Sequence, residues 1–244
     1  SISVKHQVNR ISSATLSFVS EPDANGNHVF GDGDDFVPGN GIEIFAGYGL
    51  EEVISIFSGV ITKQSMQANS GCGVQFDLHC KHEAVKMTFN RKNTDFVSMT
   101  DSDVINSIVS ANCLTATVED SHYRHETLVQ SGATDWDFII SRAETNGFLV
   151  ILNDKHSVDI SKPQLSQEPA LRVKMGESII DFSATLDAEV QTPSIEASTW
   201  DVDDQKLIIE KADEYSLQDD RMISAKQLSE TLGQEKQTIF SGSS

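Results

Sequence analysis

The chain contains few of the residues that build disulfide frameworks, basic surfaces or membrane spans. Its 244 residues include three cysteines, Cys72, Cys80 and Cys113, and their odd number and irregular spacing argue against a disulfide framework and fit a reducing compartment. Lys and Arg together number 18, against 37 Asp and Glu, so the net charge of −19 predicts no specific nucleic-acid binding. The sequence has no apolar run of 18 residues and no charged-then-apolar leader after Ser1, so we expect neither a membrane span nor a signal peptide.

Acidic residues are abundant instead, and they are concentrated in two stretches. Residues 21–52 hold eight acids and no Lys or Arg, and residues 187–221 hold eleven acids against three basic residues. Each stretch therefore carries a net charge of about −8 by direct count. The pattern supports two interpretations: an acidic surface that keeps the protein soluble, or an acidic wall along which cargo passes without sticking.

Residues 1–95 are predicted to form a first, antiparallel β-barrel domain, because apolar and polar residues alternate in several short runs separated by turn residues. The predicted strands cover residues 1–9, 14–19, 42–49, 53–62 and 74–80, with a long polar loop at 21–35. Pro38 and Gly39 predict a turn before the third strand. Gly59 lies inside the fourth strand, which predicts a bulge or a close approach of another chain segment.

Residues 96–165 are predicted to be an α+β insert. Thr100 begins a helix that ends near Asn112, and a strand follows at 115–118. A second helix begins after Thr134, with Trp136 on its apolar face and Asp137 as part of a capping box. Gly147 stops this helix, and an apolar hairpin follows at 148–160.

Residues 166–244 are predicted to be a second, incomplete tube-type β domain. Its strands are expected at 171–175, 179–186, 194–201 and 207–209, and a short helix is expected from Ser224 to Gly233. We expect no closing element after that helix and no internal repeat of solenoid period. The predicted fold class is therefore mainly β, with two antiparallel β-barrel-like tube domains flanking a helix-plus-hairpin module.

Candidate catalytic and metal-binding residues do not form a convincing set. Cys72, His79, Cys80 and His82 are the metal-like cluster, but His79 and Cys80 point to opposite faces of a regular strand, and Cys80 is in phase with core residues. His122 and His125 lie in a polar loop with no nucleophile elbow nearby. Asp135 and Asp137 lie two positions apart at a helix start, which sends their carboxylates in different directions. We therefore predict no catalytic, cofactor or metal site, and a structural protein rather than an enzyme.

Several stretches together resemble the contractile-tail hub and spike family. This family comprises the VgrG spike proteins of type VI secretion, the late-control D proteins of phages, and the spike-hub proteins of extracellular contractile injection systems; the resemblance to the last group is greatest. The matching stretches are 36–39, 42–48, 56–61, 81–88, 100–105, 127–147, Trp200 with Asp201, and 225–233. The markers among them are Trp136, Asp137, Gly147, Pro38, Gly39, Gly59 and Trp200.

The resemblance implies a homotrimeric baseplate hub that joins the hexameric tail tube to the central spike. Its implied partners are further copies of itself, the tail-tube protein, and spike-tip and baseplate proteins. The resemblance also implies assembly in the bacterial cytoplasm, followed by incorporation into a phage tail or an injection particle. Two alternatives remain open: a cell-wall hydrolase that uses Asp135, Asp137, His122 or His125, and a carbohydrate- or receptor-binding tail module.

Overall fold

The structure is a computed structural model that describes residues 1–20, 34–47, 49, 52–69, 73–153, 156–164, 172–179, 181–183, 185, 192, 194–201, 204–212, 225–233 and 237–240. The chain divides into two compact units, Ser1–Pro163 and Gln164–Ser244. The predicted fold class, mainly β with an α+β insert, is confirmed. The finer division at residues 95 and 165 stays a prediction. Among the described residues, no helix has the length and apolar character needed to cross a membrane.

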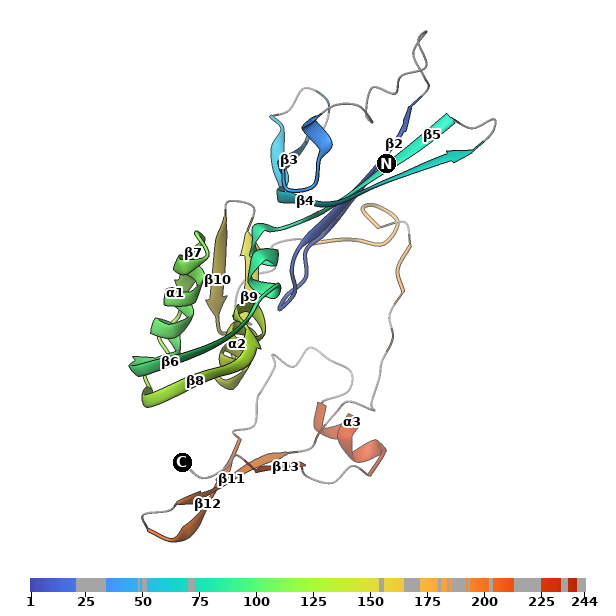
Figure 1. Cartoon of the computed structure of the whole chain (residues 1–244). Coiled ribbons are helices and arrows are strands. Elements are labelled where there is room, and N and C mark those ends of the chain that lie inside the picture. Colours follow the sequence, from blue (N-terminus) through green and yellow to red (C-terminus); the bar gives the residue numbers. More distant parts are fainter. Residues whose placement is uncertain are drawn as a thin grey trace. The chain divides into compact units, whose positions relative to one another are not determined.

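A five-stranded antiparallel sheet opens the first unit, with the strand order β1-β2-β5-β4-β3 (Figure 1). The strands are β1 (Ile2–Lys5), β2 (Ser13–Ser20), β3 (Gly41–Ala46), β4 (Ile54–Asn69) and β5 (Gly73–Lys81). Every second side chain of β2 and β5 faces one buried cluster, as the alternation predicted. The fully or nearly buried members of this cluster are Ala14, Leu16, Ile44, Phe57, Ile61, Leu78 and Cys80.

Gly59 marks a close approach, which is one of the two alternatives that its position in the strand predicted. A Cβ atom at Gly59 would lie 2.3 Å from the backbone oxygen of Lys81 on β5. The register shifts of β4 lie elsewhere, between Ile61 and Lys63 and opposite Ile44 and Phe45. Glycine is therefore needed here for space rather than for a bulge.

The first strand is shorter than predicted, because the chain turns at Asn9. β1 ends at Lys5, and Asn9 has a left-handed backbone with φ of 58°. The Asn9 N–H donates to the Val150 carbonyl (2.9 Å), and its side-chain oxygen accepts from the Val150 N–H (2.8 Å). Asparagine tolerates this conformation better than most residues, so the turn ties the N-terminal segment to the second part of the unit.

The second part of the unit contains two short helices and two further sheets. Its elements are η2 (Glu83–Thr88), β6 (Arg91–Thr100), α1 (Asp101–Ala111), β7 (Thr115–Val118), β8 (Arg124–Thr134), α2 (Asp135–Thr145), β9 (Leu149–Asn153) and β10 (Ser157–Ser161). β6 and β8 form an antiparallel ribbon, and β7, β10 and β9 form a sheet in that order. β10 runs parallel to β7 and antiparallel to β9. The helix-plus-hairpin module predicted from the sequence is thus present, but β8 begins where a loop containing His125 was expected.

Both helices begin and end as predicted, with one difference at α2. At α1, Thr100 and Asp103 form a complete capping box. At α2, Thr134 Oγ1 accepts from the Asp137 N–H (3.1 Å), but the return bond from the Asp137 carboxylate is absent. Asp137 is exposed, so it acts as an acidic residue near the positive end of the helix rather than as half of a capping box.

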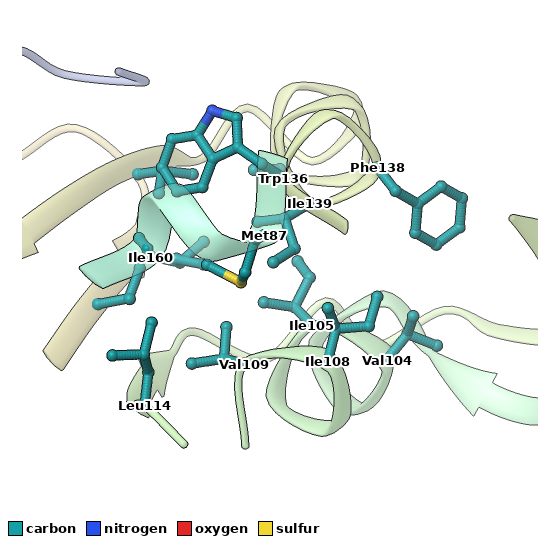
Figure 2. Packing of buried hydrophobic residues seen from close by; sticks show 14 of the residues in the cluster. Met87, Val104, Ile105, Ile108, Val109, Leu114, Trp136, Phe138, Ile139 and Ile160 are labelled. Carbon is teal, nitrogen blue, oxygen red and sulfur yellow. The ribbon is translucent and has the colours of Figure 1, made fainter. Parts of the chain in front are cut away.

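A single hydrophobic cluster joins η2, the two helices and the strands around them. Figure 2 shows Met87 of η2 between the side chains of α1 and α2, with Trp136 on one side and Val109 on the other. Trp136 and Ile139 are buried as the helical spacing predicted. Phe138 is also buried and stacks on Phe96 of β6, with ring centroids 6.0 Å apart.

The described residues of the second unit form a mixed three-stranded sheet and one helix. Its elements are β11 (Ile195–Asp201), β12 (Lys206–Lys211), α3 (Ala225–Thr231) and β13 (Gln237–Phe240). β11 pairs antiparallel with β12 and parallel with β13, so the prediction that no closing element follows the helix is wrong. The described parts of 172–185 contain a single bridge, Met175 to Ile179, in place of the two predicted strands. Ser224, the predicted cap of α3, and most of the 21–35 loop lie outside the described residues.

Candidate functional site

A polar pocket of about 390 Å³ lies beside the start of α1. Its lining residues are Thr100, Ser102, Asp103, Asn106, Val118, Asp120, His122 and Arg124. Two contacts join its polar groups: Arg124 Nη2 lies 3.8 Å from Asp103 Oδ2, and His122 Nδ1 lies 3.2 Å from Asp120 Oδ2. The backbone N–H of His122 also donates to Asp120 (3.0 Å), and this bond is the main reason that the pKa of Asp120 is lowered. The pocket therefore offers both hydrogen-bond donors and hydrogen-bond acceptors.

His122 and His125, the two candidate general bases, lie in different environments. His122 is exposed at the pocket rim with a left-handed backbone, φ 59°. His125 is mostly buried on β8, with Nε2 3.2 Å from Asp101 Oδ1 in a geometry that is not a hydrogen bond. The hydroxyl groups of Thr100 and Ser102 lie 2.9 Å apart and bond to each other. His122 and the two hydroxyl groups thus line the same pocket, where the hydroxyls already have partners, whereas His125 lies beside the buried carboxylate of Asp101.

Asp135 and Asp137 are separated by burial as well as by direction. Asp135 is buried and accepts hydrogen bonds from Lys92 Nζ (2.6 Å), Asn112 Nδ2 (2.9 Å) and Gln130 Nε2 (3.1 Å). Burial by itself raises the pKa of Asp135, but these three donors outweigh it, so the pKa lies below its ordinary value. A carboxylate held charged by three donors is a structural anchor and a poor general acid, because it does not carry a proton near neutral pH.

A second buried carboxylate, Asp101, was not singled out by the sequence. Arg142 binds it through two hydrogen bonds, Nε to Oδ1 (2.6 Å) and Nη2 to Oδ2 (3.1 Å), and Asn146 Nδ2 donates to Oδ2 (2.8 Å). Burial opposes the charged form, but the bonds from Arg142 and Asn146 prevail and lower the pKa of Asp101. The available signal was the motif Thr-Asp-x-Asp, which occurs at both helix starts.

The metal-like cluster does not converge. Cys80 is a core thiol, only 1% exposed, and burial raises its pKa to about 11. His82 is buried and caps η2: its Nδ1 accepts from the Ala84 N–H (3.1 Å), and Nε2 lies 3.2 Å from the Asn153 carbonyl. His79 faces the other side of β5 from Cys80, and Cys72 lies outside the described residues. Within the described ranges, no three His, Cys, Asp or Glu side chains are grouped to hold a metal ion.

The remaining sequence markers occupy structural positions. Gly39 has φ of 105°, and its N–H donates to the Ile61 carbonyl (2.8 Å), so the turn after Pro38 is fixed to β4. Gly147 has φ of 67° and ends α2. Trp200 pairs with Leu207 across β11 and β12, and about half of its surface is exposed. Their role in the assembled protein stays a prediction.

Exposed apolar side chains gather at two places that could bind another protein. Phe45, Val53 and Ile54, at the end of β3 and the start of β4, are 54%, 60% and 65% exposed. Trp200 and Leu207 lie opposite each other on one face of the second unit's sheet, and Ile209 follows Leu207 on the same side of β12. Apolar side chains grouped in this way are typical of protein interfaces.

A family model described as the Alg8 N-terminal domain matches residues 1–244, the whole chain. No curated protein matches it in sequence. Among solved structures, the 43 kDa tail protein of prophage MuSo2 from Shewanella oneidensis is similar over 99% of this chain and 72% of its own, with a TM-score of 0.66 at 7% identity. A tail protein from Neisseria meningitidis MC58 is similar over 95% of this chain and 63% of its own, with a TM-score of 0.60 at 13% identity.

Two further solved structures extend the likeness. The prophage tail protein gp18 from Listeria monocytogenes EGD-e is similar over 98% of this chain and 65% of its own, with a TM-score of 0.54 at 12% identity. A chain of the Francisella PdpA-VgrG complex has a TM-score of 0.50 at 12% identity, and this chain spans 35% of its length. Identities this low establish the fold alone: the chain has the fold of phage tail proteins.

Proposed function

The chain belongs to the family of the Alg8 N-terminal domain, and from its tail-protein fold we propose that it is the structural hub of a contractile injection machine or phage tail. Three copies would form a ring that joins the hexameric tail tube to the central spike. The observation that carries the proposal is the likeness to the Shewanella prophage tail protein over 99% of this chain. The proposed role is non-enzymatic.

The unpaired edges of the five-stranded sheet support the proposal that the chain assembles with other chains. In the described part of the first unit, β1 and β3 are the edges of the five-stranded sheet, and neither has a strand on its outer side. Such edges present unpaired N–H and C=O groups, which natural proteins cover, shorten or use for pairing. Phe45 on β3 and Ile54 at the start of the adjacent β4 are exposed, so a neighbouring chain that pairs with the β3 backbone could also cover apolar surface.

The second unit offers another apolar surface, formed by Trp200, Leu207 and Ile209. Full burial of a large apolar side chain stabilises a complex by about 1.5–3 kcal/mol, and Trp200, Leu207 and Ile209 are all about half exposed. Covering the three would therefore contribute roughly 2–4 kcal/mol by the same scale, before the cost of association. We propose that this face packs against another copy of the chain.

The expected partners follow from the proposed position in the particle. They are two further copies of the chain, the tail-tube protein above the ring, and spike-tip and baseplate proteins below it. Assembly would take place in the bacterial cytoplasm, before the particle is used or released. Some carboxylates of 21–52 and 187–221 are proposed to line the lumen, and a trimer structure with both stretches wholly on the outer surface would contradict this.

The mass of the protein in solution and in the assembled particle tests the proposal. We expect a trimer of the wild-type chain, and we expect Trp200→Ser to weaken it while Phe89→Ser, a matched exposed aromatic in the first unit, leaves it intact. Native mass spectrometry gives the first measurement, and the copy number per particle gives the second. A chain that remains a monomer inside the assembled particle would overturn the hub.

A separate measurement tests the non-enzymatic role. Asp135→Asn, Asp137→Ala, His122→Ala and His125→Ala address every residue of the hydrolase alternative. We expect no difference from wild type in a peptidoglycan-digestion assay. A lytic activity that is lost in one variant while its circular dichroism stays native would favour the hydrolase.

The polar pocket favours a second candidate function, a carbohydrate- or receptor-binding tail module. Its volume of about 390 Å³ and its mixed donors and acceptors fit a small polar ligand. Saturable binding to a glycan on an array, if it is lost in the Arg124→Ala variant, would support this function. If the protein binds no glycan on the array, the structural hub is the only proposed function that remains.

A further inference from the structure

Residues 90–123 and 124–157 have the same element order and align without a gap at an offset of 34 positions. The first segment contains β6, α1 and β7, and the second contains β8, α2 and β9, with both helices 11 residues long. Eight of the 34 aligned positions are identical: Thr100/Thr134, Asp101/Asp135, Asp103/Asp137, Ile105/Ile139, Ser107/Ser141, Asn112/Asn146, Asp120/Asp154 and His122/His156. The sequence thus contains a two-copy similarity, which is distinct from the solenoid arrays that the prediction of no repeat of solenoid period concerned.

The backbone repeats at the same offset. Within the described part of 90–157, every residue with positive φ belongs to an aligned pair. The pairs are Ser98 (53°) with Gly132 (59°), Cys113 (60°) with Gly147 (67°), and His122 (59°) with His156 (56°). Positive φ is uncommon outside glycine, so three coincidences at one offset are strong evidence of a common local structure.

The ribbon between the two segments has the register of a two-fold arrangement. Asp95 of β6 lies opposite Val129 of β8, and these two positions are 34 residues apart. On either side, Phe96 pairs with Leu128 and Thr94 with Gln130, so rotation about the central pair exchanges one pairing for the other. The two segments therefore pack about a local pseudo-two-fold axis through the middle of the ribbon.

The C-terminal end of each helix is hydrogen-bonded to the N-terminal end of the other helix. Asn146, the C-cap of α2, donates to Asp101 at the start of α1 (2.8 Å), and Asn112, the C-cap of α1, donates to Asp135 at the start of α2 (2.9 Å). Each asparagine also bonds within its own helix, Asn112 Nδ2 to the Ile108 carbonyl (2.9 Å) and Asn146 Nδ2 to the Arg142 carbonyl (2.8 Å). One amide thus joins the end of its own helix to the beginning of the other.

We infer that residues 90–157 are two copies of one strand–helix–strand unit, and that the two Asp–Asn pairs form a reciprocal lock in which the C-cap of each helix holds the first turn of the other helix. Asp101 and Asp135 are each 3% exposed. If one helix end frays, its asparagine leaves a buried carboxylate of the other helix short of a donor, which is costly. The negative charges also lie at the positive ends of both helices, so each lock reinforces the dipole of the helix that it begins.

The two copies differ at one corner, and the difference accounts for the polar pocket. In the second copy, Trp136 is buried in the shared core, and His156 Nδ1 lies 3.3 Å from Glu83 Oε2 of η2. In the first copy, Ser102 replaces the tryptophan, and His122 contacts its own loop residue Asp120 instead. The corner that the second copy uses to hold η2 is therefore open in the first copy, where it forms the pocket.

Double-mutant cycles in the full chain test the lock. Asp101→Asn with Asn146→Ala, and Asp135→Asn with Asn112→Ala, probe the two bonded pairs. Each pair should be coupled by roughly tenfold in the unfolding equilibrium constant, the scale of a hydrogen bond to a charged group. The crossed pairs, Asp101 with Asn112 and Asp135 with Asn146, are matched controls and should be additive, because no bond joins them.

Amide hydrogen exchange provides a readout that a purely local C-cap would not change. Asn146→Ala should raise exchange in the first turn of α1, and Asn112→Ala should raise it in the first turn of α2. If the aspartate variants do not fold, these two asparagine variants decide the question by themselves. Additive bonded pairs, or exchange that rises only in the mutated residue's own helix, would overturn the lock.

Discussion

Replacing Gly59 with alanine should destabilise the first unit strongly, for a reason that is visible in one distance. The added Cβ would lie 2.3 Å from the Lys81 oxygen and 2.8 Å from its carbonyl carbon. Real Cβ atoms do not approach other heavy atoms closer than about 3.0 Å, and the obstacle here is backbone rather than a flexible side chain. Either β4 or the end of β5 must therefore move by roughly 1 Å, and overpacking of this kind costs about 1–3 kcal/mol or more.

Gly41→Ala is the matched control in the neighbouring strand. Its nearest contact would be the Gly59 oxygen at 3.9 Å, an ordinary van der Waals distance. At a site without strain, alanine stabilises by about 0.4–1 kcal/mol through the unfolded chain. The two variants should thus differ by roughly 3 kcal/mol, which combines these ranges.

Hydrogen exchange of the β4 and β5 amides, followed by mass spectrometry, measures the difference locally, which suits a chain with two compact units. A difference of 3 kcal/mol corresponds to roughly a hundredfold faster opening. Urea unfolding of the same variants gives an independent value. If Gly59→Ala exchanges at the rate of Gly41→Ala, the close approach to Lys81 does not determine the residue at this position.

Further predictions concern acid and thiol chemistry. Asp101 and Asp135 have lowered pKa values in the folded state, so the stability that they contribute is present above the ordinary Asp pKa of about 3.9 and is lost as the pH falls through their folded values. Unfolding measured against pH should therefore become steeper below about pH 4, and Asp101→Asn should flatten that slope; an unchanged slope would contradict the role of the carboxylate. In a Cys72→Ser protein at pH 8, iodoacetamide should label exposed Cys113 at least about a hundredfold faster than buried Cys80, whose pKa is raised to about 11; equal rates would contradict the burial of Cys80.

Local chemistry was the part of the fold that the sequence predicted well. Thr100 and Thr134 were identified as caps, Gly147 as a helix stop and Cys80 as a core thiol, and all four are confirmed. Each of these assignments depends on a side chain and its neighbours within a few positions. The missed strand β13 is different, because its partner β11 lies some 40 residues away and the pairing is parallel. No local pattern reveals such a pairing.

The buried carboxylates show the same limit within the candidate site. Asp135 was considered together with Asp137 because they are close in sequence, yet its partners are Lys92, Asn112 and Gln130 from three other elements. Asp101 was overlooked because its partners lie more than 40 positions along the chain. The lowered pKa values of Asp101 and Asp135, which make them poor general acids, depend on donors from other elements of the fold. The different environments of Asp135 and Asp137 depend on the same contacts.

By itself, then, the sequence determined the fold class and the boundaries of the first two α-helices. These follow from periodicity, capping and turn chemistry, which act between residues that are neighbours along the chain. Only the tertiary structure decided that Gly59 faces Lys81, that the C-cap asparagine of each helix bonds to the first turn of the other helix, and that β6 and β8 pair in a two-fold register. Those facts are contacts between segments far apart in sequence, and folding alone brings such segments together.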